Sequence, residues 1–254
     1  IPLSLYLLTW VFVFQSRPLL PHVWMLMLQP VAIVGVVALL ATSSTDRLAL
    51  VLSGHLLGFF VIAMAAHGEL ARGRPAASHL TSFYVSLSAG GMIGGLFAGL
   101  IAPNVFSWIA EYPILLVLAV LCRPIPHQSP NMREHAVLAL AIVLLIGLTA
   151  PRLLFDWQPD RDLLSYADPI VVGVAAVGAV LMLAERPMKA AIVVAAALAA
   201  IQLYPSNQQR VETVRSFFGV HKIFDTSDGR FRVLMHGTTI HGAQQLLTAD
   251  GKAP

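Results

Sequence analysis

The sequence predicts an all-α, multi-span transmembrane helix bundle of about eight spans, with a small C-terminal β-hairpin extension. Of its 254 residues, 57% are hydrophobic and 11% are charged, and the mean hydropathy is +0.76, whereas soluble domains carry about 25% charged residues. Residues 80–110 contain no Asp, Glu, Lys or Arg, which lets a helix cross roughly 30 Å of hydrocarbon. After Pro205, apolar and polar residues alternate with period two, as in a strand. We therefore predict a helical bundle over residues 1–204 and an extramembrane segment over residues 205–254.

Eight apolar runs are assigned to spans. They are residues 2–14, 23–41, 48–66, 80–102, 105–122, 136–150, 170–184 and 190–204. The first run is short for a full span. Pro30 is tolerated in the second because a neighbouring helix can satisfy the carbonyl that proline frees. The third follows a polar turn in which Thr45 or Asp46 suits an N-cap, and it carries His55.

The fifth run can be drawn in two ways. It is either one span that holds Glu111, or an interfacial piece that leads into a short helix from Pro113. We favour the single span, because Trp108 and Tyr112 suit a membrane interface. The last two runs form a helical hairpin joined by residues 185–189.

Residues 216–236 predict two strands around a turn at residues 225–229, where Gly229 can take the positive φ that such a turn needs. Phe218, Val220 and Phe224 share one face of the first strand, and Phe231, Val233 and Met235 share one face of the second. A lone hairpin is marginal in water, so we expect a partner to cover it. The residues predicted to dock that partner are Phe217, Phe218, Phe224, Phe231, His236 and His241.

Loop charges predict an orientation in a bacterial inner membrane. Counted on alternate sides, seven basic residues fall together, and three fall opposite. The first group is Arg17, Arg72, Arg74, Arg123, Arg133, Arg186 and Lys189, and the second is Arg47, Arg152 and Arg161. The basic side is expected to be cytoplasmic, which makes the C-terminal segment periplasmic. The net charge of +3 is small and scattered, so no nucleic-acid partner is expected.

Two blocks of sequence resemble the bacterial fused membrane/spermidine-synthase-like proteins. The first is HGELARGRPAASHLTSFY with GGMIGGLFAGLIAP and EYP, and the second is RSFFGVHKIFDTSDGRFRVLMHGTTIHGAQ. The resemblance implies a multi-span region followed by the start of a spermidine-synthase-like domain. The nucleotide-binding lobe of that family, with its glycine-rich loop, has no counterpart in these residues. The chain starts inside an apolar run at Ile1 and stops soon after the second block, so we expect it to be an internal piece of a longer polypeptide.

The densest ionisable group is His67, Glu69, Arg72 and Arg74, with Glu111 as a candidate to complete it. Glu69 and Arg72 are three residues apart and can pair on a helix. Ionisable residues in membranes are candidates for a proton, cation or headgroup site. The structural alternative, which we favour, is an interfacial salt bridge that sets the depth of a helix.

Glycines at four-residue spacing mark the fourth run. One row is Gly91, Gly95 and Gly99, and a second is Gly90, Gly94 and Ala98. Small residues at this spacing let helix backbones approach closely, so we predict helix packing rather than a phosphate-binding loop.

No cofactor and no metal are predicted. The histidines lack the spacing that puts two imidazoles on one helix face, and His236 with His241 is a weak metal signal. Asp156, Asp160, Asp162 and Asp168 lack an EF-hand pattern and fit a solvated loop.

Three functions remain open. The first is a non-catalytic membrane subunit or scaffold, in contact with membrane lipids and other membrane-protein subunits. The second is an aminopropyltransferase-like enzyme whose catalytic domain lies outside this sequence. The third is a transporter or channel with Glu69, Arg72 and Glu111 along a path.

Overall fold

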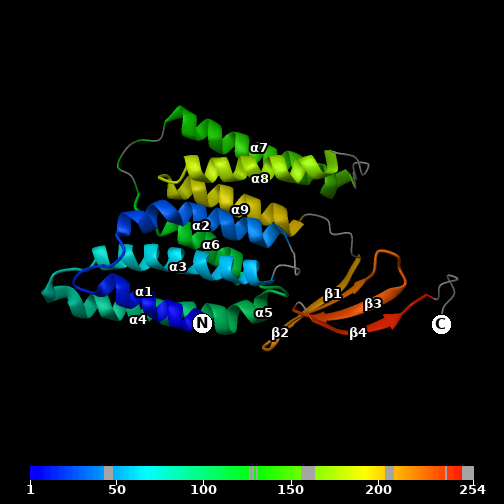
Figure 1. The fold of residues 1–254 in the computed structure, drawn as a ribbon, viewed down its shortest axis with the longest axis horizontal. Coiled ribbons are helices and arrows are strands. Elements are labelled where there is room, and N and C mark those ends of the chain that lie inside the picture. The colour runs from blue at the N-terminus through cyan, green and yellow to red at the C-terminus, as the bar shows by residue number, and fades with distance from the viewer. Residues whose placement is uncertain are drawn as a thin grey trace. The chain divides into compact units, whose positions relative to one another are not determined.

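The computed structural model describes residues 1–42, 48–125, 127, 129, 131–155, 164–203, 209–237 and 239–247 (Figure 1). The chain forms two compact units. Unit 1 comprises Ile1–Pro75 and Ile114–Tyr204, and unit 2 comprises Ala76–Pro113 and Pro205–Pro254. The N-cap predicted at Thr45 or Asp46, and the aspartates at 156, 160 and 162, lie outside the described residues. Asp168 lies inside a helix rather than in the predicted loop.

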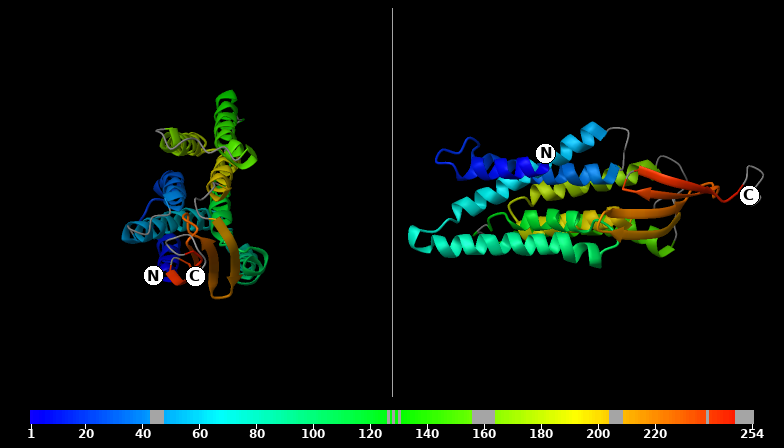
Figure 2. Two further views of the ribbon diagram at one scale, coloured as in Figure 1. Left: turned by 90° about the vertical axis from the view of Figure 1, so that its right-hand side faces the viewer. Right: turned by 90° about the horizontal axis from the view of Figure 1, so that it is seen from below.

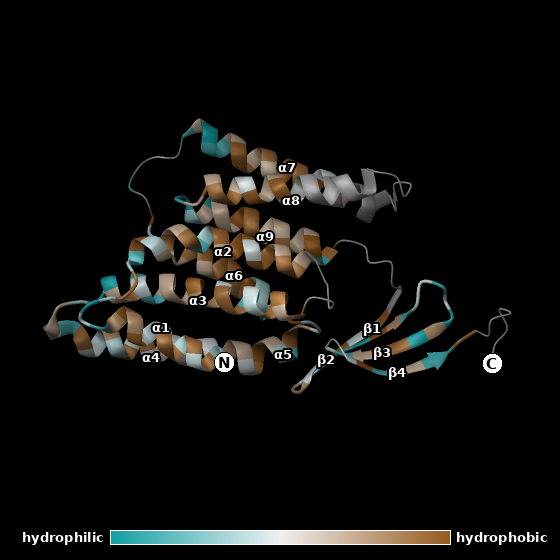
Figure 3. Cartoon of the chain, viewed as in Figure 1, coloured by the Kyte–Doolittle hydropathy of each residue, from teal (hydrophilic) through white to brown (hydrophobic). Residues whose placement is uncertain are grey.

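Helices make up most of the described part of unit 1. They are α1 (Pro2–Phe14), α2 (His22–Thr42), α3 (Leu48–Arg72), most of α6 (Glu111–Leu121), α7 (Met132–Phe155), α8 (Leu164–Met182) and α9 (Pro187–Leu203). Helix α3 packs against α1 and α2, and α7 packs against α8 and α9. These helices run roughly side by side, and apolar residues cover most of their length (Figures 2 and 3).

Unit 2 holds one long helical run, from Ala77 to Val105. It consists of η1 (Ala77–His79), α4 (Leu80–Leu96), the π-helical turn η2 (Phe97–Ile101) and α5 (Ala102–Val105). The π-turn ends two residues before Pro103. Proline has no N–H and its ring crowds the carbonyl four residues earlier, so a wider turn is a way to keep the helix continuous.

Among the described residues, three helical stretches are long and apolar enough to cross a membrane: His22–Ala41, Leu48–Arg72 and Ala77–Val105. Shorter apolar helices cover Pro2–Phe14, Glu111–Leu121, Gly173–Met182 and Pro187–Leu203. A helix therefore stands at every run assigned to a span, and three of these helices have the length and composition of a full crossing.

The single span favoured for residues 105–122 is not what the structure has. Helix α5 ends at Val105, Phe106 is extended, and α6 starts at Glu111. The structure matches the alternative interpretation, in which a non-helical segment leads into a short helix, and this helix starts at Glu111 rather than at Pro113. A carboxylate in the first turn favours a helix start at Glu111.

Pro30 behaves as predicted. It lies inside α2, and it cannot donate to the Leu26 carbonyl. The Arg123 guanidinium, just beyond α6, donates to that carbonyl over 2.6 Å. It also donates to the Gln29 side-chain oxygen at 2.9 Å, while Gln29 donates to the Ala119 carbonyl at 2.9 Å. Gln29 is fully buried. The Arg123 guanidinium therefore takes the place of the backbone N–H that Pro30 lacks, and it also binds the buried Gln29 side chain.

The predicted hairpin is the middle of a four-stranded antiparallel sheet in the order β1-β2-β3-β4. The strands are β1 (Gln209–Ser216), β2 (Gly219–Asp225), β3 (Phe231–His236) and β4 (Thr239–Gln245). The β2–β3 turn falls where predicted, with Gly229 at φ +66°. Phe218 was predicted inside the first strand, which is wrong, because Phe217 and Phe218 form the β1–β2 turn. The alternating pattern runs straight through this turn and so does not reveal it.

The remaining predicted face is present. Val220 and Val233 are buried, and Phe224 lies opposite Val233 in the register. All seven residues of β4 are exposed. An exposed strand of mostly polar residues carries little hydrophobic signal, which is why β4 was not predicted.

Gly219 is a point where this sheet requires glycine. Its φ is +142°, and a Cβ there would lie 2.5 Å from His236 Nε2. We expect Gly219→Ala to destabilise the sheet by about 2 kcal/mol, because it adds backbone strain to a steric clash. Gly242→Ala is the matched control, since a Cβ at Gly242 has open space, and its cost should stay within about 0.5 kcal/mol. Hydrogen exchange of the sheet amides in the full chain measures both, and equal costs would contradict the prediction.

Candidate functional site

The candidate site of unit 1 centres on Glu69, in the last turn of α3. Its Oε1 lies 2.5 Å from His22 Nε2, at the start of α2, and 3.7 Å from Arg72 Nη1. The Glu69–Arg72 pair predicted from the sequence is therefore present. The side chains of His22 and Glu69 are mostly buried, whereas that of Arg72 is 62% exposed. His22 was missed because it lies 47 residues away in sequence.

Gly68 allows this approach of the two helices. A Cβ built on Gly68 would overlap the imidazole of His22 at Nδ1. Among the described residues Nδ1 is buried and has no hydrogen-bond partner. The tautomer that fits both nitrogens donates Nε2–H to the Glu69 carboxylate and leaves an unprotonated Nδ1 against Gly68.

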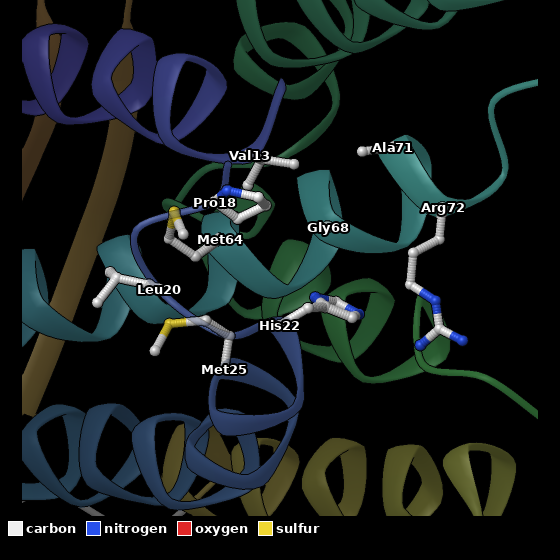
Figure 4. Close-up of a pocket in the computed structure, with 9 residues that line it drawn as sticks. All are labelled: Val13, Pro18, Leu20, His22, Met25, Met64, Gly68, Ala71 and Arg72. Carbon is white, nitrogen blue, oxygen red and sulfur yellow. The ribbon is translucent and has the colours of Figure 1, made fainter. Parts of the chain in front are cut away.

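A cavity of about 200 Å³ adjoins this pair. Its lining is Val13, Pro18, Leu20, His22, Met25, Met64, Gly68, Ala71 and Arg72 (Figure 4). Apart from His22 and Arg72 the lining side chains are apolar or absent. The cavity is therefore mostly apolar, and the two polar side chains that line it, His22 and Arg72, both pair with the Glu69 carboxylate.

His67 belongs to a different cluster, although the sequence grouped it with Glu69. Its Nδ1 lies 2.9 Å from the hydroxyl of Thr9, which itself donates to the Tyr6 carbonyl at 2.7 Å. Thr9 therefore accepts the Nδ1–H proton of His67. The imidazole also lies 4.3 Å from the Trp10 ring centroid. Residues two apart on a helix point to different faces, so His67 and Glu69 separate on geometric grounds.

Glu111, which the sequence suggested as a candidate to complete the group around Glu69, is paired with Arg215 within unit 2. Arg215 of β1 grips its carboxylate at both oxygens, with Nη2–Oε1 at 2.6 Å and Nη1–Oε2 at 2.8 Å. The same guanidinium donates to the Trp108 carbonyl at 2.6 Å. The hydrogen bonds from Arg215 lower the pKa of Glu111, and those to Glu111 raise the pKa of Arg215. We call these three residues the β1 clamp.

A second ionic cluster of unit 1 joins the start of α7 to that of α9. Glu134 Oε2 lies 2.9 Å from Arg186 Nε and 3.1 Å from Lys189 Nζ, and Arg186 also donates to the Ser129 carbonyl at 3.0 Å. All three side chains are largely buried.

The two clusters lie at the same end of unit 1. Burial lowers the pKa of Arg123, and the charges of Glu185 and Glu69 oppose this shift, so the charge of Glu69 in one cluster and that of Glu185 beside the other both act on Arg123. We call this the basic end; it holds Arg72, Arg123, Arg186 and Lys189. These four are among the residues that the loop-charge count put on one side. Arg74 lies just beyond α3, where its N–H donates to the Ala71 carbonyl.

The predicted glycine rows are open. Among the described residues, nothing beyond the helix's own nearby backbone comes within 4 Å of a Cβ built on Gly90, Gly91, Gly94, Gly95 or Gly99. Close helix approach occurs elsewhere, at Gly54 and Gly58 of α3, where added Cβ atoms would overlap Leu39 and Val36 of α2. These glycines have the same four-residue spacing, so the sequence carried a signal for this contact that the prediction for the fourth run did not use.

The residues predicted to dock a partner divide into two groups. Phe224 and Phe231 are partly buried in the sheet, whereas Phe217 and Phe218 are exposed. His236 stacks on His221 at 4.5 Å between centroids and lies 5.5 Å from the His241 ring. Among the residues that the structure describes, no group of three His, Cys, Asp or Glu side chains is placed to hold a metal ion.

Comparison of the chain with protein-family models, curated proteins and solved structures finds no match. The resemblance to fused membrane/spermidine-synthase-like proteins, and the aminopropyltransferase activity it implies, therefore stay predictions.

The Arg123 contacts lead to a testable coupling. We expect Arg123→Ala to cost about 1–3 kcal/mol, because it leaves the Leu26 carbonyl and the Gln29 oxygen buried without donors. In a Pro30→Ala background the cost should fall, since an alanine at position 30 supplies the missing N–H to the Leu26 carbonyl. A double-mutant cycle of unfolding free energies in one detergent measures this coupling.

The control is Arg133→Ala, an exposed arginine at the start of α7, with an expected change within about 0.5 kcal/mol. Strictly additive costs for residues 30 and 123 would show that the guanidinium does not replace the lost backbone bond.

Proposed function

We propose that this chain is a non-catalytic, multi-span membrane protein that serves as a subunit or scaffold and packs against a transmembrane helix of a partner protein. The observation that carries the proposal is the open glycine surface of α4. In the stretch Ala77–Val105, 6% of the most apolar window is buried, against 28% in each of the other two candidate spans.

Lipid is a poor cover for such a surface. Glycine is about 1 kcal/mol less favourable than alanine in a helix interior, and it offers acyl chains no side chain to contact. Close packing of a second helix offsets this cost, because backbones that approach closely gain van der Waals contact. Five glycines in rows thus favour a helix as the occupant over lipid alone.

The proposed location is a bacterial inner membrane. The positive-inside rule puts the basic end of unit 1 in the cytoplasm. Helix α9 runs from Lys189 at that end to Leu203 at the other, so the chain leaves the helices of unit 1 on the periplasmic side.

Leucine substitutions in one glycine row test the proposal. The variant Gly91→Leu with Gly95→Leu should abolish close approach, so the complex extracted in mild detergent should fall to the mass of the lone chain. Native mass spectrometry measures this. Gly147→Leu is the matched control, because Gly147 of α7 also has open space but belongs to no such row. A chain that is already alone in mild detergent, or a complex indifferent to the leucines, would overturn the proposal.

Movement of a proton or cation through unit 1 is a second candidate function. The Glu69 site favours it, because His22 and Arg72 both hold this carboxylate and line the cavity. A histidine hydrogen-bonded to a carboxylate has the donor and acceptor that a proton transfer needs.

Flux into reconstituted vesicles tests this second candidate. We expect Glu69→Gln to abolish it, because the amide cannot exchange a proton, while Glu185→Gln, the same change at an exposed residue, should leave flux unchanged. A pH-sensitive dye inside the vesicles reports the rate. Equal flux in the two variants, or none in the unchanged chain, would remove this function.

A further inference from the structure

The turn between β1 and β2 presents two adjacent phenylalanines to solvent. Phe217 is 85% exposed and Phe218 is 84% exposed, and their rings pack edge to face with 5.6 Å between centroids. A single exposed apolar residue is ordinary on a protein surface. Two adjacent aromatic rings at the tip of a turn, with no cover among the described residues of unit 2, point to a contact surface.

The β1 clamp fixes where this turn lies within unit 2. Arg215 is two residues before Phe217, and it is bound to Glu111 and to the Trp108 carbonyl. Trp108 follows α5, the end of the candidate span Ala77–Val105, by three residues, and β1 contacts α5. Figure 1 shows the β1–β2 turn beside α5. The aromatic turn is therefore held at the level where this span ends.

The segment to which the clamp binds β1 carries exposed apolar residues: Val105 is 66% exposed and Ile109 is 56% exposed. Within the clamp, Arg215 and Glu111 form an ion pair. Aromatic rings are enriched where a span meets the headgroups. Lipid rather than a partner protein is the occupant that this position favours, because the turn lies next to a helix end that itself requires a bilayer.

The turn is also held in shape before any contact is made. Ser216 Oγ accepts the Phe218 N–H at 3.3 Å, and His236 Nε2–H donates to the Phe218 carbonyl at 3.2 Å. Gly219 completes the turn at φ +142°. A rigid turn loses little conformational freedom on insertion.

From this geometry we propose that Phe217 and Phe218 insert into the bilayer interface beside the end of the Ala77–Val105 span and anchor the sheet to the membrane surface. The inference rests on the proposed membrane function, since it needs that span to cross a bilayer. It adds a second point of contact with lipid, made by the sheet rather than by a helix.

Spin-label accessibility in vesicles of phosphatidylcholine and phosphatidylglycerol tests the anchor. In the full chain with Cys122→Ala, single cysteines replace Phe218, Ser227 or Ile93, and each carries a nitroxide. Ile93 is an exposed residue of α4, and Ser227 lies in the exposed turn at the other end of the hairpin. Collisions with oxygen report lipid, and collisions with a water-soluble nickel complex report water.

We expect the oxygen-to-nickel ratio at residue 218 to be shifted from the value at residue 227 toward that at residue 93. A ratio at 218 equal to that at 227 overturns the anchor and leaves the span intact. A water-like ratio at 93 overturns the membrane function itself. Phe217→Cys serves as a second labelled position if Phe218→Cys fails to fold.

Disrupting the β1 clamp gives a second test of the anchor. Adding Glu111→Gln to the Phe218→Cys chain removes the charge that holds Arg215, so the ratio at 218 should move toward the water value while the ratio at 93 stays unchanged. A ratio at 218 that remains lipid-like without the clamp would contradict the role given to Arg215.

Discussion

Pro30 removes the N–H that would hold the Leu26 carbonyl, and in a helix that crosses a bilayer, as proposed for α2, no water replaces that bond. Arg123 replaces it from a neighbouring helix, and Gln29 completes the connection by donating to the Ala119 carbonyl. The repair ties the start of α2 to the end of α6 across more than ninety residues of sequence. The backbone hydrogen bond that α2 lacks at Pro30 is thus replaced by contacts between α2 and the end of α6.

The same constraint governs the ionisable residues of unit 1. The paired carboxylates of unit 1 lie at helix ends, as expected if its helices cross a bilayer as proposed, because a charge at the bilayer centre costs about 2.5–3.5 kcal/mol on insertion scales. Glu69 takes His22 and Arg72, and Glu134 takes Arg186 and Lys189. Because the partners come from α2, α3, the α8–α9 connection and α9, pairing gathers basic residues of several elements around two carboxylates. In unit 1 the same ion pairs therefore join neighbouring helices and bring basic residues together.

Unit 2 is built differently, because its apolar surfaces stay open. Among the described residues, nothing beyond the helix's own nearby backbone lies within 4 Å of a Cβ built on the glycines of the α4 rows, and Phe217 and Phe218 are exposed. The β1 clamp binds the sheet to the segment that follows the candidate span. Unit 1 thus uses its polar groups for internal contacts, whereas unit 2 presents surfaces suited to a helix and to lipid.

Local sequence was enough for much of the fold. Apolar runs located each helix, period-two alternation located β2 and β3, and Gly229 marked their turn, because each of these signals is contained within a few neighbouring residues. It also identified the Glu69–Arg72 pair, three residues apart on one helix. The end of α5 at Val105, and the turn at Phe217 and Phe218, were missed because apolar character continues through both.

The partners of the site residues came only from the tertiary structure. His22 meets Glu69 across 47 residues, Thr9 meets His67 across 58, and Arg215 meets Glu111 across 104. Such pairs leave no periodic trace, since any of several ionisable residues at a helix end satisfies the same local pattern. The sequence by itself located the apolar helices and the β2–β3 hairpin, and it showed that most charges lie between the apolar runs. Folding decided which charge meets which, because that depends on which helices lie side by side.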